Sequence, residues 1–264
     1  MPVSPTIRIG VGGWTFEPWC DNFYPAGLPH ARELAHASRH LTAIEVNGTY
    51  YGSQKPATFA KWHDETPDDF VFTLKASRFS TNRKVLAQGG ESIMRFVNSG
   101  IAELRDKLGP INWQFLPTKK FDPEDFGAFL RLLPKEVAGL PLRHVVEVRH
   151  ESFAVPEFIE LLRLHGVAAV LTDNPQFPRL HDATADFVYA RLQCSTEEEP
   201  AGYAPAALDR WTATAEAWAK GQSPRTLPLL APALKAAHRD VFVFFISGFK
   251  PRNPAAAMAL IDRL

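Results

Sequence analysis

Eight short runs rich in β-branched and aromatic residues recur along the chain, and stretches with helical spacing separate most of them. This alternation is typical of repeated βα units whose strands lie parallel in one sheet. The expected strands are residues 8–13, 43–47, 70–76, 111–115, 144–149, 168–173, 187–192 and 241–247. The expected helices are residues 31–40, 58–65, 91–107, 124–133, 156–165, 206–220 and 254–264. The sixth connection, residues 174–186, is too short and too rich in proline for a full helix.

The number and order of these units are compatible with two fold classes. Eight strands with crossover helices predict a closed α/β fold, the (β/α)₈ barrel of TIM type, and the chain's 264 residues match the roughly 250 residues typical of that barrel. An open doubly wound sheet with extra edge strands would give a similar pattern. No G-x-G-x-x-G or G-x-x-x-x-G-K-[ST] motif follows any strand, which disfavours the nucleotide-binding form of the open sheet. We therefore predict a single TIM-barrel domain over residues 1–264.

Charge and hydropathy limit the partners of the chain. Lysine and arginine balance aspartate and glutamate at 29 each, which argues against a broad surface for nucleic acid or anionic membrane. The sequence has no run of about 18 apolar residues, and residues 1–6 have no signal-peptide pattern. Cys20 and Cys194 lie far apart and outside any zinc-type spacing, so free thiols are expected. These features predict a cytoplasmic protein with no membrane partner.

Polar residues close most of the expected strands, and active sites of (β/α)₈ barrels form at this C-terminal end. Side chains two residues apart in a strand point to the same face, so Glu45 is grouped with Asn47, and Glu147 with Arg149. The side chains expected together at the barrel mouth are Glu45, Asn47, Lys75, Asn112, Gln114, Glu147, Arg149, Asp173 and Arg191.

Six of these side chains carry charge, which is costly inside a barrel unless the charges are paired. Three carboxylates balance three cations, namely Glu45, Glu147, Asp173, Lys75, Arg149 and Arg191. One interpretation is an internal salt-bridge network that closes the barrel and has no other role. The other is a functional site, because all six lie near the C-terminal ends of their strands.

As a functional site, this set predicts an enzyme whose partner is a small anionic molecule. Lys75, Arg149 and Arg191 would hold a phosphate or carboxylate group. Glu147 or Glu45 would act as general acid or base. A divalent metal ion, if one is used, would take the three predicted carboxylates as oxygen ligands. Beyond this option the cofactor stays open, and we predict no dedicated metal site.

Uncharged and aromatic side chains complete the expected site. Asn47 and Gln114 would donate hydrogen bonds to the substrate. Trp14 and Tyr50 follow the first two strands, where they would form a wall against a ligand ring. Asp173 would orient a water molecule or a cationic partner.

Several uncommon motifs occur in an order that resembles a known family. They are Gly12-Gly13-Trp14-Thr15-Phe16, Glu45-Val46-Asn47-Gly48-Thr49-Tyr50-Tyr51, Lys75-Ala76, Gln114-Phe115-Leu116-Pro117, Glu147-Val148-Arg149-His150 and Asp173. The chain resembles the YecE-like family, a domain of unknown function (DUF72). The resemblance covers most of the chain and is most specific in its first two thirds. It implies a TIM-type barrel and an uncharacterised activity.

Three positions depart from the pattern of that family. Asn82 and Gln193 stand where its members have histidine, and Ser247 stands where they have an asparagine pair. Losing two histidines removes side chains suited to proton transfer near neutral pH. A non-catalytic barrel that binds a metabolite is therefore an alternative to an enzyme. Metal-dependent phosphodiester or nucleic-acid chemistry is a third alternative by fold analogy, although the few histidines and the balanced charge argue against it.

Overall fold

Eight parallel strands close into a barrel in the structure, a computed structural model that describes residues 6–20, 22–224 and 226–264. The strands are β1 (Ile7–Gly12), β2 (Ala43–Val46), β3 (Val71–Lys75), β4 (Leu108–Gln114), β7 (His144–Glu147), β8 (Ala168–Thr172), β9 (Phe187–Leu192) and β10 (Asp240–Phe245). Their order around the barrel is β1-β10-β9-β8-β7-β4-β3-β2, and β1 closes the ring on β10. The predicted (β/α)₈ barrel is confirmed, and each expected strand is present within a few residues of its predicted ends.

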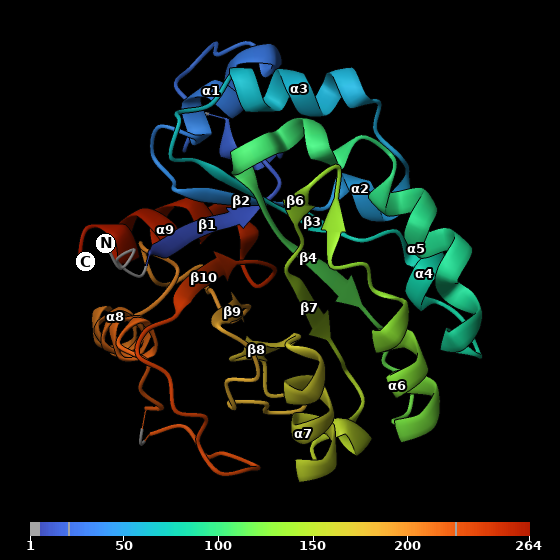
Figure 1. Cartoon of the computed structure of the whole chain (residues 1–264). Coiled ribbons are helices and arrows are strands. Elements are labelled where there is room, and N and C mark those ends of the chain that lie inside the picture. Colours follow the sequence, from blue (N-terminus) through green and yellow to red (C-terminus); the bar gives the residue numbers. More distant parts are fainter. Residues whose placement is uncertain (1–5, 21, 225) are drawn as a thin grey trace.

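Helices surround the barrel and cover the outer faces of its strands (Figure 1). They are α1 (Glu33–Ala37), α2 (Gly48–Tyr51), α3 (Pro56–Asp64), α4 (Arg78–Thr81), α5 (Gly90–Val97), α6 (Pro123–Leu132), α7 (Pro156–His165), α8 (Pro205–Ala219) and α9 (Asn253–Ile261). The helices α3, α6, α7 and α8 begin at a proline, whose fixed φ suits the first turn and whose missing N–H loses no helical bond there. Among the described helices, none has the length and apolar character needed to cross a membrane. The signal-peptide prediction rests mainly on residues 1–5, which lie outside the described residues.

The single helix expected over residues 91–107 is corrected by the structure. It is divided into α5 and a 3₁₀ helix over Ile101–Lys107. Gly100 lies between them with a φ of 109°, which favours glycine. A Cβ at Gly100 would come within 2.7 Å of Pro56 in α3. The break therefore depends on a tertiary contact that helical periodicity cannot reveal.

A small hairpin was also not predicted. It joins β5 (Glu136–Val137) and β6 (Leu140–Pro141) outside the barrel. Ala138 and Gly139 form the turn, and both have positive φ. Alanine is rarely used in such a turn, so the usual Asn-Gly or Asp-Gly signal is missing from the sequence.

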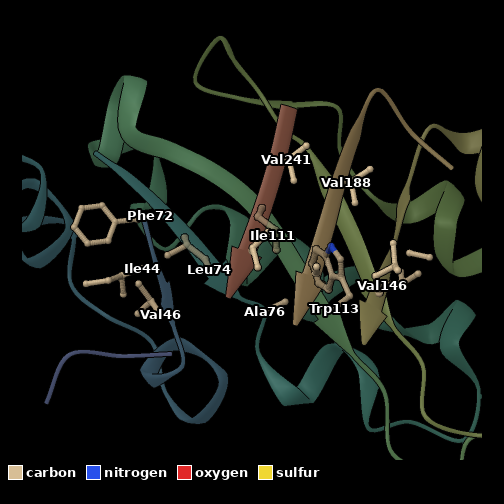
Figure 2. Packing of buried hydrophobic residues seen from close by; sticks show 14 of the residues in the cluster. Ile44, Val46, Phe72, Leu74, Ala76, Ile111, Trp113, Val146, Val188 and Val241 are labelled. Carbon is tan, nitrogen blue, oxygen red and sulfur yellow. The ribbon is translucent and has the colours of Figure 1, made fainter. Parts of the chain in front are cut away.

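Strand side chains alternate between two cores. Those that point outward, such as Val146 on β7, pack beneath the helices (Figure 2). Those that point inward form a smaller cluster in which Phe242 and Phe244 of β10 are the largest contributors with Phe187 and Tyr189 of β9. On β7, the inward-pointing side chain is apolar at Val145 and charged at Glu147, two residues later. The barrel interior is therefore apolar in one part and polar toward the C-terminal mouth.

The absence of a side chain at Gly10 on β1 makes room for this inner packing. A Cβ at Gly10 would lie 1.8 Å from the backbone oxygen of Ala43 and 3.4 Å from the ring of Phe244. We expect Gly10→Ala to reduce the free energy of unfolding by about 1–3 kcal/mol, measured by urea denaturation. Gly52→Ala is the matched control, because Gly52 is exposed and a Cβ there has no neighbour within 4 Å. Equal stability of the two variants would contradict the close-packing role of Gly10.

Candidate functional site

A buried set of ion pairs forms the floor of the barrel mouth. Arg191 on β9 lies between Glu45 on β2 and Glu147 on β7, and the three side chains are at most 3% exposed. The Nη2 of Arg191 donates to Oε1 of Glu45 at 3.0 Å, and its Nη1 donates to Oε2 of Glu147. Burying charges is costly, so these pairings compensate for the loss of water around each group. We call Glu45, Arg191 and Glu147 the triad.

Uncharged side chains bind the remaining carboxylate oxygen sites of the triad. The hydroxyl of Tyr189 donates to Oε2 of Glu45 at 2.7 Å, and Nδ2 of Asn112 lies 3.3 Å from the same oxygen. The Nε2 of Gln114 donates to Oε2 of Glu147 at 2.7 Å. These donors lie on β4 and β9, so the triad and its donors connect β2, β4, β7 and β9.

Arg149 completes the surroundings of Glu147 and fixes its charge. The Nε and Nη2 of Arg149 donate to Oε1 of Glu147 at 3.0 and 2.8 Å. Burial alone would raise the pKa of Glu147, but Arg191 and Arg149, with the amide of Gln114, lower it to about 2. Every carboxylate oxygen of the triad therefore has a donor, and Glu147 is ionised at neutral pH. This environment suits a fixed structural anion better than a group that transfers protons.

A cavity of about 330 Å³, here called the mouth cavity, has Arg191 in its lining. The full set of lining residues is Gly12, Asn47, Tyr51, Lys75, Gln114, Arg149, Arg191, Phe245, Ile246, Ser247, Lys250 and Asn253. Four of them are cationic, and none of these described residues is a carboxylate or a histidine. The lining therefore has the charge expected of a site that receives an anion.

Lys75 at the end of β3 is the most deeply placed lysine of the mouth cavity. It is 7% exposed, and its ammonium lies 4.3 Å from the centroid of the Tyr50 ring. No carboxylate in the described part of the chain lies within ion-pair distance of it. Burial and the nearby Arg191 lower the pKa of Lys75 to about 8, although the charges of Glu45 and Glu147 act in the opposite direction.

The structure brings most of the predicted site residues together. Those that line the mouth cavity are Asn47, Lys75, Gln114, Arg149 and Arg191, and those that lie beneath it are Glu45 and Glu147. Tyr50 reaches this group through its contact with the ammonium of Lys75. Side-chain alternation in a strand is a local property, and closure of the barrel then places the alternating ends around one opening.

A second cavity of about 410 Å³, the tryptophan cavity, has Trp14 in its lining. Trp14 and Trp62 meet edge to face there, with ring centroids 5.0 Å apart. Gly12, Asn47 and Lys250 line both cavities. The polar mouth cavity is therefore continued by a space with an aromatic wall.

The placement expected for Asp173 is corrected. β8 ends at Thr172, whose hydroxyl accepts a hydrogen bond from Nε2 of Gln193 at 3.1 Å. Asp173 instead accepts from the backbone N–H of Gln193 at 2.6 Å and from the hydroxyl of Tyr203 at 2.7 Å. Its carboxylate therefore does not join the two carboxylates of the triad. In the described residues, no group of three or more histidine, cysteine, aspartate or glutamate side chains has the arrangement of a metal site.

Tyr189 and Lys250 belong to the site but were not predicted. Tyr189 precedes Arg191 by two residues on β9, so the same alternation rule could have found it. Lys250 begins a short 3₁₀ helix over Lys250–Arg252 after β10, where strand periodicity gives no information. Its ammonium lies 4.0 Å from the centroid of the Phe16 ring, and burial lowers its pKa.

The closed barrel and its polar mouth define a protein of the TIM-barrel class. Residues 8–264 match the family model described as "Protein of unknown function DUF72", and the chain belongs to this family. It is 29% identical over 150 residues to the UPF0759 protein YecE of Escherichia coli (strain K12), covering 56% of this chain and 50% of YecE. It is 25% identical over 185 residues to the UPF0759 protein YunF of Bacillus subtilis (strain 168), covering 64% of this chain and 61% of YunF.

The chain therefore matches about half to three fifths of the length of these two relatives. Among solved structures, a DUF72 family protein from Thermotoga maritima MSB8 superposes with a TM-score of 0.73 and 24% sequence identity. That superposition covers 97% of each chain. The likeness supports the barrel fold over nearly the whole chain.

The ion pairs of the triad should contribute to the free energy of unfolding. Glu147→Gln leaves Arg191 and Arg149 without their shared carboxylate, so we expect a loss of about 3–5 kcal/mol in the free energy of unfolding at pH 7. The folded pKa of Glu147, about 2, lies below the ordinary value of 4.5 for a glutamate, so its contribution to stability is complete above about pH 5 and declines as the pH falls toward 2. Urea unfolding at several pH values measures this difference.

Glu151→Gln is the matched control, because Glu151 follows the same strand but is exposed. We expect it to change stability by less than about 0.5 kcal/mol. A Glu147→Gln protein as stable as this control at pH 7 would show that the triad does not hold the mouth together.

Proposed function

We propose that this protein is an enzyme that acts on a small metabolite bearing a phosphate or carboxylate group, held in the mouth cavity. The observation that carries this proposal is the cation-rich lining of the cavity. Lys75, Arg149, Arg191 and Lys250 converge there, and no carboxylate shares the lining in the described chain. Glu45 and Glu147, beneath the mouth cavity, offset two of these positive charges. A bound anion would neutralise the positive charge that remains.

The chemistry of the four cations fits two kinds of contact with an anion. The guanidinium groups of Arg149 and Arg191 are oriented by the triad carboxylates, which prepares them for a planar or tetrahedral anion. Lys75 and Lys250 supply point charges whose ammonium groups contact aromatic rings rather than carboxylates. A bound anion would relieve the cost of keeping these two ammonium groups partly away from water.

The loop after β10 supports the same assignment. Ser247 and Gly248 both have positive φ, and the backbone oxygen of Ser247 accepts from Nδ2 of Asn253 at 3.1 Å. Ser195 also donates to this oxygen at 3.3 Å. The bond between Ser247 and Asn253 holds this segment against the start of α9. Lys250 lies between these two residues in the sequence. Loops after the last two strands of TIM-type barrels are frequent phosphate sites.

The sizes of the two cavities constrain the substrate. A volume of about 330 Å³ is at the small end of the range for ligand sites, so the mouth cavity suits a compact anionic group. The tryptophan cavity would receive an uncharged ring or sugar carbon skeleton against Trp14 and Trp62. A Cβ at Gly12 would lie 2.8 Å from Nδ2 of Asn47. Glycine at this position therefore leaves room for the Asn47 amide, which lines both cavities.

One observation favours a second candidate, a barrel that binds the metabolite without transforming it. The described lining of the mouth cavity contains no histidine, and Glu147 is held ionised by its partners. An enzyme at this site would therefore need another reactive group. Nucleic acid is a less suitable partner, because the cavity is compact and the chain has balanced charge.

Binding of inorganic phosphate tests the proposed anion site. We expect saturable binding by isothermal titration calorimetry at low ionic strength, and about tenfold weaker binding in Lys250→Met. Lys250 lies outside the triad, so its removal should leave the fold intact. Lys120→Met is the control, because Lys120 is exposed and outside both cavities. Absence of saturable binding, or equal affinity in the Lys250→Met protein, would count against the proposal.

A further inference from the structure

We infer that Lys75 is the reactive group of the mouth cavity, where its ε-amine forms an imine with an aldehyde or ketone carbonyl of the anionic substrate. This inference rests on the proposed function and makes it more specific. Arg149, Arg191 and Lys250 would hold the anionic group, and Lys75 would meet the carbonyl carbon. The substrate class is then a small carbonyl compound that also bears a phosphate or carboxylate.

The position of Lys75 suits a nucleophile. It is the last residue of β3, and its backbone oxygen accepts a hydrogen bond from the hydroxyl of Thr49 at 2.7 Å. The base of the side chain is therefore fixed by a strand and by a buried contact. Its amine reaches the mouth cavity, where the ring of Tyr50 covers one side of it. A nucleophile needs this combination of a fixed base and an end that faces the ligand space.

The triad leaves Lys75 without a carboxylate partner. Each oxygen of Glu45 and Glu147 already accepts a hydrogen bond from Arg191, Arg149 or an uncharged donor. Lys75 therefore lies in the field of both carboxylates but pairs with neither. A lysine whose only role was structural would be expected to bind one of them, because an unpaired buried ammonium is costly.

The protonation state of Lys75 also suits a nucleophile. The groups that act on Lys75 are the cations Arg191 and Arg149 and the anions Glu45 and Glu147. With burial, they lower the pKa of Lys75 to about 8. About a tenth of the side chain is then neutral at pH 7, compared with about one in three thousand for an ordinary lysine. Desolvation and neighbouring cations are the established means of activating lysine as a nucleophile.

The proposed step is balanced without an oxidant or reductant. The amine lone pair forms a bond to the carbonyl carbon while the carbonyl π electrons move to oxygen, and a proton passes from nitrogen to that oxygen. The resulting carbinolamine takes up a second proton from solvent and loses water as the nitrogen lone pair forms the C=N bond. The products are a protonated imine and one water molecule. The imine can then accept electrons from an adjacent C–H or C–C bond.

Pyridoxal 5′-phosphate is a suitable probe, because it carries both an aldehyde and a phosphate. The full-length protein would be treated briefly with the probe, reduced with borohydride and digested, and each modified lysine would be located by mass spectrometry. We expect Lys75 to be labelled first, with a rate that rises with pH and is half-maximal near pH 8. Inorganic phosphate should slow this labelling, and pyridoxal without phosphate should react more slowly.

Two variants separate the reactive amine from a simple positive charge. Lys75→Arg keeps a positive charge but removes the primary amine, so we expect the fast labelling at this position to disappear, while phosphate binding by the unmodified protein reports on the anion site separately. Lys120→Arg is the matched control and should retain fast labelling at Lys75. As a second measurement, pyruvate with cyanoborohydride should give a stable adduct at Lys75 in the unmodified protein and none at that position in Lys75→Arg.

The outcomes distinguish this inference from the proposed function. Labelling spread evenly over exposed lysines, in a protein that still binds phosphate, would overturn the role of Lys75 but keep the anion site. Fast labelling at Lys75 that phosphate does not slow would support the reactive amine and overturn the anion site. A protein that neither binds phosphate nor is labelled at Lys75 would overturn both.

Discussion

The guanidinium of Arg191, held between Glu45 and Glu147 inside the barrel, is the contact on which the geometry of the mouth depends. It joins β9 to β2 and β7 across the interior, at the level where apolar packing ends. Because Arg191 and Arg149 occupy the oxygens of Glu147, their guanidinium planes are fixed toward the mouth cavity. Because the oxygens of Glu45 and Glu147 already accept hydrogen bonds, Lys75 has no carboxylate partner among the described residues. The triad therefore determines the environment of the Lys75 amine.

This arrangement is difficult to explain by stability alone. Buried ion pairs commonly contribute little compared with apolar side chains of similar volume, because desolvation offsets the attraction between the charges. The other part of the barrel interior is filled by rings such as Phe242 and Phe244, so apolar filling is available to this fold. Polar residues concentrate where the strands end, which is also where TIM-type barrels place their sites. We therefore interpret the triad as a support that positions the cations of the mouth cavity.

Much of the fold and site could be predicted from the sequence, because the signals involved are local. Period-two alternation identified Glu45, Glu147 and Arg191 as inward residues, and the closed barrel then accounts for their meeting. Asp173 was expected to close the sixth strand, but β8 ends at Thr172, and the Asp173 carboxylate accepts hydrogen bonds from Gln193 and Tyr203 instead. Gly100 separates α5 from the next 3₁₀ helix at a point where a Cβ would meet Pro56, and Lys250 enters the site from the 3₁₀ helix over Lys250–Arg252. Both depend on tertiary structure, which periodicity does not describe.

If the mouth cavity is an anion site built on the triad, an oxyanion should bind inside it. This can be tested with a crystal of the protein equilibrated with selenate, whose anomalous scattering locates it without reference to the protein coordinates. We expect an anomalous peak inside the mouth cavity, in contact with at least two of Lys75, Arg149 and Lys250. Ordered selenate elsewhere on the protein, with no peak in this cavity, would show that the mouth cavity is not an anion site.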